Sequence, residues 1–227
     1  MSATALRGLT ILALAAMLAG CNVVYSEQPL FTRKDSVGAP VLRPGLWLIR
    51  SSGDCAFDET LPTRKWPECA DDRGTIIGGP ADKPSMGGHP IVLAAGDPIV
   101  AQVRDRDDHG DARYYFAGLQ PKARDAAGRV VAFRWWVARC GPPPPRPPPA
   151  DASAAPDPAK GRPAAGDAAK PVPVIPDSYV SSTPLPGLEV RGYDCVARDP
   201  KVVRAAVAAS PSWPDIEIES AHWVRSR

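Results

Sequence analysis

Residues 129–140, RVVAFRWWVARC, contain the clearest strand of the chain. Along this segment Val131, Phe133 and Trp135 alternate with side chains of a second face. Successive side chains of a strand point to opposite faces, so the alternation predicts one face in a core and the other half exposed. The second face carries Ala132, Arg134, Trp136 and Ala138. On that face, Trp136 is a candidate partner-facing aromatic residue.

The segments around this strand read as further short strands separated by turns. Residues 113–119 are expected to pair with 129–140 across a turn at 120–128. Other apolar or alternating runs bounded by Gly, Pro, Ser or Asp lie at 45–50, 75–77, 91–94, 98–104, 187–191 and 215–224. The pattern predicts a mainly β fold, a small antiparallel sheet in a sandwich or barrel-like arrangement.

One short helix is predicted near the C-terminal end, over residues 200–209. Asp199 has the side chain of a helix N-cap, and Pro200 suits the first helical position. An apolar stripe follows, formed by Val202, Val203, Ala206 and Val207. This stripe predicts a helix that packs one face against the β-rich body.

The composition limits the class of protein. The chain has 227 residues, enough for one domain with tails at roughly 100–200 residues per domain. Lys and Arg number 27 against 25 Asp and Glu, a net charge of +2, which argues against a nucleic-acid binder. The 28 prolines are well above an average near 5%, so part of the chain is not expected in a packed core.

Much of the proline lies in residues 141–177, a Pro- and Ala-rich segment. Thirteen of the residues 141–176 are proline and none is aromatic. Such a stretch cannot bury enough apolar surface to offset the entropy of ordering it, so a disordered insertion is predicted. It separates a first part of the β-rich domain at 44–140 from a second part at 178–227.

The first 21 residues have the composition of an export signal. Arg7 provides a positive charge, and residues 9–18 form an apolar run of ten, too short to span a bilayer. Residues 18–21, LAGC, place a branched apolar residue and two small residues before a cysteine. This order resembles the lipobox of bacterial lipoproteins.

The resemblance implies that Cys21 is acylated and that residues 1–20 are removed as a signal peptide. Two or more acyl chains such as palmitate hold a protein stably on a bilayer, whereas one gives marginal binding. Residues 21–43 are then expected to be a lipidated tether. Residue 22 is Asn rather than the Asp of an inner-membrane retention signal, which favours the outer membrane, facing the periplasm.

Four cysteines remain after Cys21: Cys55, Cys69, Cys140 and Cys195. An even number in an oxidising compartment indicates disulfides, and four cysteines allow three sets of pairings. Cys55–Cys69 is preferred because its loop is short, which leaves Cys140–Cys195; each bond is worth about 2–4 kcal/mol. A zinc site is not expected, because no C-x-x-C pair occurs and the three histidines lack ligand spacing.

No catalytic, cofactor-binding or metal-binding residue is predicted. Residues 105–111 resemble the start of an EF-hand loop, but position twelve is Phe116 rather than Glu, so a solvated turn is the better interpretation. No G-x-S-x-G or S-x-x-K motif accompanies His89, His109 or His222. The sequence therefore does not indicate an enzyme, although a site assembled in three dimensions need not show in a sequence.

Three functions from different classes stay open. The first is a non-catalytic envelope lipoprotein, a binding or structural module that contacts the bilayer through acylated Cys21 and an envelope protein partner through Trp66 or Trp136. The second is an inhibitor-like barrel lipoprotein that plugs a foreign enzyme. The third is a small periplasmic hydrolase with a His–Asp site around His89 or His109. A packed interior with an exposed aromatic patch would favour the first two, and an internal cavity with a His beside a carboxylate the third.

Overall fold

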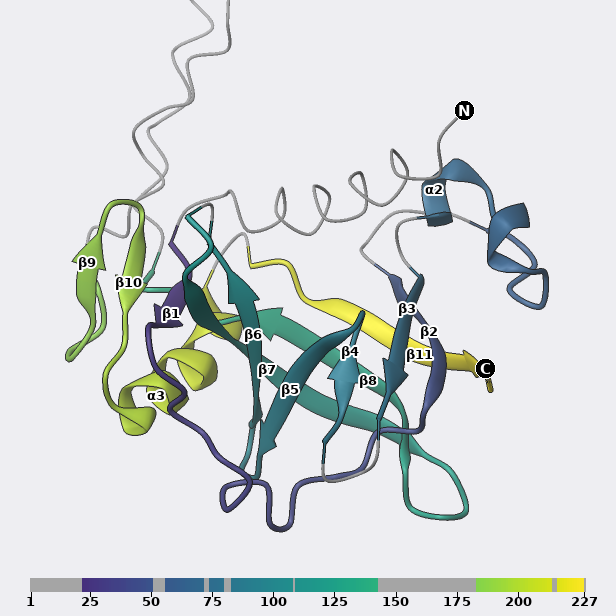
Figure 1. The fold of residues 1–227 in the computed structure, drawn as a ribbon, viewed down its shortest axis with the longest axis horizontal. Helices are drawn as coiled ribbons and strands as arrows, with labels where there is room; N and C mark the ends of the chain where they lie inside the picture. Colours follow the sequence, from purple (N-terminus) through teal and green to yellow (C-terminus); the bar gives the residue numbers. More distant parts are fainter. Residues whose placement is uncertain are drawn as a thin grey trace, which may run out of the picture.

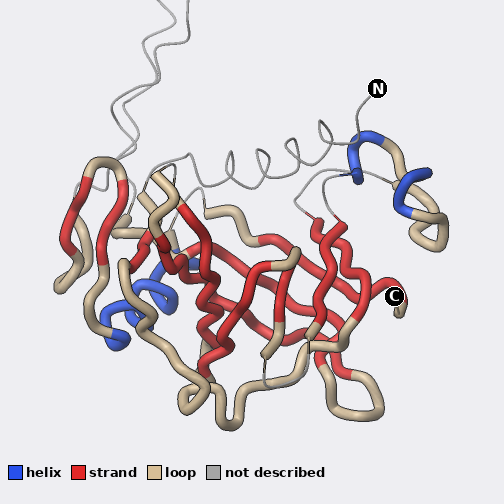
Figure 2. The backbone as a smooth tube through the Cα atoms, in the orientation of Figure 1, coloured by secondary structure: helices blue, strands red, loops and turns tan. Residues whose placement is uncertain are grey.

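The structure is a computed structural model that describes residues 22–50, 56–71, 74–79, 83–107, 109–142, 183–213 and 216–226. Within these residues, eight antiparallel strands close into a barrel, which confirms the predicted mainly β fold (Figure 1; Figure 2). The barrel order is β6-β5-β4-β3-β2-β11-β8-β7, and the pairing of β7 with β6 closes it. The strands are β2 (Gly45–Arg50), β3 (Gly74–Gly78), β4 (Ser85–Met86), β5 (His89–Ala94), β6 (Ile99–Arg106), β7 (Ala112–Arg124), β8 (Val130–Val137) and β11 (Glu219–Arg225).

Short strands extend the sheet beyond the barrel. β1 (Val24–Ser26) pairs antiparallel with the first part of β7, which places Tyr25 opposite Tyr115. β10 (Asp194–Val196) runs parallel to β1, and β9 (Glu189–Arg191) pairs antiparallel with β10. Figure 1 shows β1 in purple beside the green β9–β10 hairpin, on the side of the molecule away from the C-terminus. Segments from the two ends of the chain therefore meet at this side of the barrel.

The inward-facing side chains fill the barrel. Trp47, Leu119 and Phe133 are each no more than 3% exposed, and the ring centroids of Trp47 and Phe133 are 5.0 Å apart. The same cluster contains Leu42, Ile77, Ile91, Leu93, Ile99, Ala101, Val130 and Ala221. Phe133 and the partly buried Trp135 of β8 pack in this cluster, but Val131 and Val137 of the same predicted face do not, and Val130 is buried there instead, so the alternation predicts the core-facing side only in part.

The predicted helix is confirmed as α3 (Pro200–Ala209). The Asp199 side chain caps it by accepting a hydrogen bond of 2.8 Å from the N–H of Lys201. A short turn of 3₁₀ helix, η3 (Ser210–Ser212), follows. The buried stripe of α3 packs in a second core cluster outside the barrel: Val203, Ala206 and Val207 with Val24, Phe31, Val100, Phe116 and Trp136. The outer face of the barrel is therefore covered where α3 lies.

Residues 56–71 form another covering segment, over the outer face of β2. It contains the short helices η1 (Thr63–Lys65) and α2 (Glu68–Asp71). Trp66 of this segment is buried in a cluster with Leu46 and Leu48 of β2. Since Leu46 and Leu48 alternate with the inward-facing Trp47, both faces of β2 are buried.

The expectation of a tether at 21–43 is wrong for its described residues, because 22–43 are folded onto the barrel. The side chain of Gln102, itself 3% exposed, accepts hydrogen bonds from the N–H of Leu30 (2.8 Å) and of Phe31 (2.9 Å) and donates one to the Phe31 carbonyl. The buried side chains of this stretch are Val23, Val24, Tyr25, Phe31 and Leu42. Their partners lie on strands distant in sequence, which local patterning does not reveal.

Several predictions fall outside the described residues. The signal peptide at 1–20 and the acylated Cys21 do so, as does the insertion at 141–177 apart from Gly141 and Pro142. Cys55 and the side chain of Cys69 also lie outside, so a Cys55–Cys69 disulfide stays a prediction.

Candidate functional site

The N-terminal root, defined as residues 22–23, directly follows Cys21 in the chain. The N–H of Asn22 donates a hydrogen bond of 2.6 Å to the carbonyl of Tyr193, and the Asn22 carbonyl accepts one of 2.9 Å from the N–H of Cys140. Asn22 is 8% exposed and has a φ of 86°, in the left-handed region that Asn tolerates better than most residues. The first residue after Cys21 is therefore held by two different parts of the chain.

Val23 ties the root to the disulfide. Its N–H donates to Asp194 Oδ1 at 3.1 Å, and its carbonyl accepts from the N–H of Cys195 at 3.0 Å. Cys195 is disulfide-bonded to Cys140, with their Cα atoms 5.6 Å apart, which confirms the predicted Cys140–Cys195 pair. The bond joins the end of β8 to β10, so both walls of the site that holds the root are linked covalently.

Asp194 is the carboxylate that contacts the root. Burial raises the pKa of Asp194 above its ordinary value, although the N–H groups of Asn22 and Val23 and the positive charges of Arg113 and Arg139 favour its ionised form. A buried carboxylate with donors on one side and guanidinium groups nearby is held in place, but its charge is not fully compensated.

The turn between β9 and β10 exposes apolar side chains beside the root. Tyr193, whose carbonyl accepts the hydrogen bond from Asn22, is 60% exposed, and Val190 is 45% exposed. Gly192 precedes Tyr193 with a φ of 61°, which allows this tight turn. Arg191 completes the surface, and Val190, Arg191 and Tyr193, which lie beside the buried Asn22, are together called the root surface.

The charges around the root surface are paired. Arg191 forms ion pairs with Glu27 and Glu189, and Glu189 also pairs with Arg198 at 3.1 Å. Hydrogen bonds from Arg191 and Arg198 hold the pKa of Glu189 below its ordinary value. The two arginines balance the two glutamates, so this set carries no net charge.

The tryptophans expected to face a partner, Trp66 and Trp136, are both buried, and each is 6% exposed. The indole N–H of Trp136 donates to the carbonyl of Val207 in α3 at 2.9 Å, and that of Trp66 donates to the carbonyl of Leu61 at 3.0 Å. This corrects the expectation: α3 covers the Trp136 ring, and the Trp66 ring packs against Leu46 and Leu48 of β2. Alternation within a strand shows which residues share a face, not what covers that face.

The histidines have separate partners. His222 Nε2 lies 2.6 Å from Glu59 Oε2, and Glu59 is also ion-paired with Arg50. Burial raises the pKa of Glu59, but the hydrogen bonds from His222 and Arg50 outweigh it and leave the pKa below its ordinary value. His89 Nδ1 lies 3.9 Å from Asp105 Oδ1, with both side chains partly exposed. Glu59 thus fastens residues 56–71 to β2 and β11.

The connection between β6 and β7 is a turn, as predicted for 105–111. Asp107 Oδ1 accepts hydrogen bonds of 2.9 Å from the N–H groups of His109 and Asp111, and Asp107 pairs with Arg113 at 3.0 Å. The carboxylate that an EF-hand would offer to calcium is used here to close the turn. In the described part of the chain, no group of three His, Cys, Asp or Glu side chains is placed to hold a metal ion.

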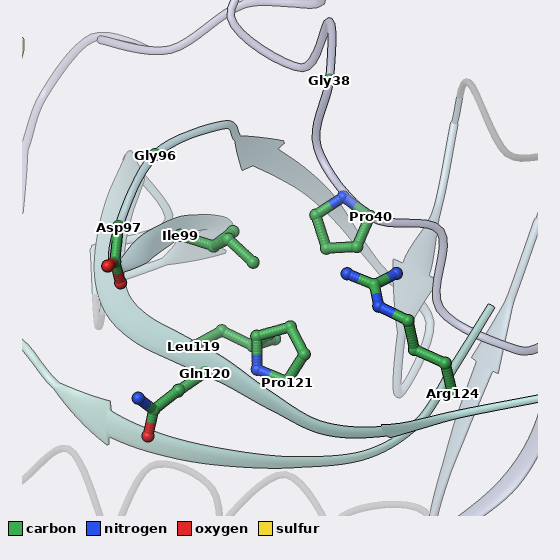
Figure 3. Close-up of a pocket in the computed structure, with 9 residues that line it drawn as sticks. All are labelled: Gly38, Pro40, Gly96, Asp97, Ile99, Leu119, Gln120, Pro121 and Arg124. Atoms are coloured by element: carbon green, nitrogen blue, oxygen red, sulfur yellow. The ribbon is translucent and has the colours of Figure 1, made fainter. Parts of the chain in front are cut away.

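A shallow hollow of about 240 Å³ opens beside the turn between β5 and β6 (Figure 3). Figure 3 shows Ile99, Leu119 and Pro121 along it, with the Arg124 side chain beside Pro40. The guanidinium of Arg124 donates to the carbonyl of Gly128 at 2.8 Å. Small-molecule sites are usually larger, roughly 300–1,000 Å³, and bury most of their ligand. The hollow is therefore a surface feature rather than an enclosed site.

Comparison of the chain with protein-family models, with curated proteins and with solved structures finds no match. None of the described helices is long and apolar enough to cross a membrane. The fold and the site thus define a structural class: an eight-stranded antiparallel barrel whose N-terminal root is fixed beside a disulfide.

Sequence reasoning missed Asn22 and Tyr193 as members of the site. Residues 191–194, RGYD, form a Gly-containing turn of the kind that joins two strands, and this signal could have indicated the hairpin. Nothing local in the sequence links that turn to residue 22, because their contact spans almost the whole chain.

Proposed function

We propose that this protein is a lipid-anchored lipoprotein of the bacterial envelope, and that its barrel is a non-catalytic binding module for another envelope protein. The anchor rests on residues 18–21, LAGC, after a charged and apolar leader. Acylation of Cys21 would attach the barrel to a membrane. The expected location is the outer membrane, with the barrel facing the periplasm.

The observation that carries the binding-module proposal is the filled barrel interior. Small eight-stranded barrels either fill their interior with side chains or hold one small ligand. Here Trp47, Leu119 and Phe133 occupy the interior, and Trp47 is fully buried. A barrel whose interior is occupied by its own buried side chains has its outer surface for recognition, which suits a protein partner better than an enclosed small molecule.

The arrangement of histidines gives less support to the hydrolase alternative. His222 and Glu59 are close enough for a proton-transfer pair, but Glu59 is also engaged by Arg50 and fastens a covering segment to the barrel. The His89–Asp105 pair is 3.9 Å apart and partly exposed rather than set in an internal cavity. An enzyme-inhibitor role is compatible with the barrel but has no specific residue to support it.

The anchor is tested by growing cells with a clickable palmitate. The full-length protein should take up the label, and Cys21→Ser should lose it. The matched control is the double variant Cys140→Ser/Cys195→Ser, which removes two other cysteines and should keep the label. An unlabelled wild type with residues 1–20 retained would contradict the anchor.

The binding module is tested by photocrosslinking in the native envelope. A photoreactive residue at Val37, which is 80% exposed and precedes Gly38 of the hollow in the chain, should give a discrete crosslinked partner. The same residue at Lys122 or Arg104, on the strands, maps how far the contact extends. Activity of the purified protein on ester or peptide substrates, lost in Glu59→Gln or Asp105→Asn, would instead support the hydrolase.

A further inference from the structure

We propose that the root surface, formed by Val190, Arg191 and Tyr193, rests directly on the phospholipid bilayer and fixes the orientation of the barrel. The inference deepens the proposed function and rests on acylation of Cys21. It adds a feature that the lipobox does not imply, namely that the barrel has no flexible spacer and touches the headgroup layer through a particular surface.

Only a short stretch of chain separates the residue to be acylated from the folded body. Consecutive Cα atoms are about 3.8 Å apart, so Cys21 is one peptide unit from Asn22. Asn22 is hydrogen-bonded to Tyr193 and to Cys140, and Val23 to Asp194 and Cys195. A flexible spacer of the length of residues 22–43 would have a mean extent of about 25 Å. In this fold residues 22–43 do not act as such a spacer, because the root is held against the barrel.

Two exposed side chains of the β9–β10 hairpin lie beside the root. Tyr193 is 60% exposed at the tip of the hairpin, and Val190 is 45% exposed on β9. Tyrosine has an apolar ring and a polar hydroxyl, and it is enriched where proteins meet the membrane–water interface. Since the Tyr193 carbonyl accepts the hydrogen bond from Asn22, the backbone of this exposed residue lies beside the first residue after Cys21.

The charged side chains at the root surface are paired. Arg191 is paired with Glu27 and Glu189, and Glu189 with Arg198, so the root surface has no excess positive charge. A basic patch would indicate attraction to anionic lipids, whereas paired charges beside a tyrosine and a valine suit a zwitterionic headgroup layer. The occupant we assign to this surface is therefore a zwitterionic phospholipid bilayer.

The root is fixed to the barrel by sheet contacts within a site that a disulfide closes. The Cys140–Cys195 disulfide closes the site around the root, and β1 continues from it into the sheet between β7 and β10. The root therefore has a fixed orientation relative to the barrel. Contact of the root surface with the bilayer then determines which side of the barrel faces away from the membrane. Figure 1 shows the C-terminal end of β11 and the segment with α2 on the side remote from β9 and β10.

The test uses the full-length protein, acylated in cells, purified and reconstituted in phosphatidylcholine vesicles that contain a lipid with a headgroup quencher. An environment-sensitive fluorescent residue is placed at position 193, and for comparison at position 37, where Val37 is 80% exposed. Residue 37 lies near the turn between β5 and β6, where Asp35 accepts a hydrogen bond from Ala95, at the other end of β6 from the root. Quenching several-fold stronger at 193 than at 37 is expected.

Equal, weak quenching at both positions in protein that floats with the vesicles would overturn the inference and leave the anchor proposal standing. Protein that neither floats nor carries an acyl group by mass spectrometry would overturn both. A second variant inserts ten Gly and Ser residues between Cys21 and Asn22, which adds a mean reach of about 17 Å. Quenching at 193 should then fall toward that at 37, with the thermal transition unchanged. Full quenching despite the spacer would contradict the claim that the short root holds the surface in place.

Discussion

Asn22 and Tyr193 are joined by a backbone hydrogen bond of 2.6 Å, although they lie far apart in the sequence. The bond seats the first residue after Cys21 against the β9–β10 turn, and the disulfide that follows Tyr193 by two residues locks the arrangement. A segment with the composition of a linker thereby becomes part of the sheet. The stability of the root is consequently the property of this protein that mutation can test most directly.

The left-handed conformation of Asn22 should make alanine a poor substitute and glycine a better one. Asn22→Ala loses the side-chain hydrogen bond to the Gly141 carbonyl and the polar side chain that lets Asn adopt the left-handed region, at a cost of about 1–2 kcal/mol. Asn22→Gly loses the same hydrogen bond without strain in that region, so its loss should be smaller. Urea unfolding of both variants checks this, and equal losses would show that backbone conformation is not what the site requires.

Removal of the Cys140–Cys195 bond should destabilise the barrel. The double variant Cys140→Ser/Cys195→Ser is expected to lose about 2–4 kcal/mol in the free energy of unfolding, because the unfolded chain gains the freedom of the opened loop. The single variant Cys140→Ser should be no more stable than the double one. A loss below about 1 kcal/mol for the double variant would mean that the hydrogen bonds of the root hold it without the disulfide.

The indole of Trp136 lies against Gly118, which leaves no room for a larger residue there. A Cβ on Gly118 would collide with the Trp136 ring, so Gly118→Ala should cost about 1–3 kcal/mol. The matched control is Gly78→Ala in β3, where the nearest atom is Ser85 Oγ at 3.7 Å and the change should be within about 0.5 kcal/mol. Thermal unfolding of the two variants distinguishes packing at Trp136 from a general effect of replacing glycine in a strand.

Glu59 should stabilise the fold at neutral pH and cease to do so in acid. Its pKa is lowered in the folded state, so its stabilisation is present above the ordinary value of 4.5 and is lost as the pH falls through the lower folded value. Glu59→Gln is expected to lose about 1 kcal/mol near neutral pH, with the difference from wild type shrinking in acid. Glu68→Gln, on an exposed helix residue, is the control, and a pH-independent difference for Glu59→Gln would contradict the assignment.

The contribution of Asp194 to stability should change with pH in the opposite direction to that of Glu59. Its pKa is raised by burial, so folding favours the protonated carboxyl: the contribution is largest below the ordinary value of 3.8 and declines as the pH rises through the higher folded value. Asp194→Asn keeps an oxygen acceptor for Val23 N–H and removes the buried charge. We expect it to be at least as stable as wild type at neutral pH by urea unfolding; a marked loss there would mean that the ionised form is needed at the root.

Local pattern was sufficient for several elements of the fold. The alternation along residues 129–140 identified β8 as a strand, and the sequence from Asp199 through Val207 identified α3 with its cap and buried stripe. Strands expected at 45–50, 91–94 and 98–104 are present as β2, β5 and β6. These features depend on residues a few positions apart, so the periods of strand and helix are enough to reveal them.

Other features follow from contacts between distant segments. The strand predicted at 215–224 begins only at Glu219, and Ile216 and Ile218 before it pack with the cluster around α3. β1 and β10 were not predicted, because each has three residues and is defined by its neighbours in the sheet.

The amino-acid sequence by itself determined the strand and helix periods, because each period is a property of neighbouring residues. Only the tertiary structure decided that the sheet closes through β6 and β7, that Trp66 and Trp136 are covered, and that Asn22 is seated beside Tyr193. Each of those outcomes depends on which distant segments approach one another. Apolar surface can be buried against many partners with similar gain, so pattern alone does not select among them.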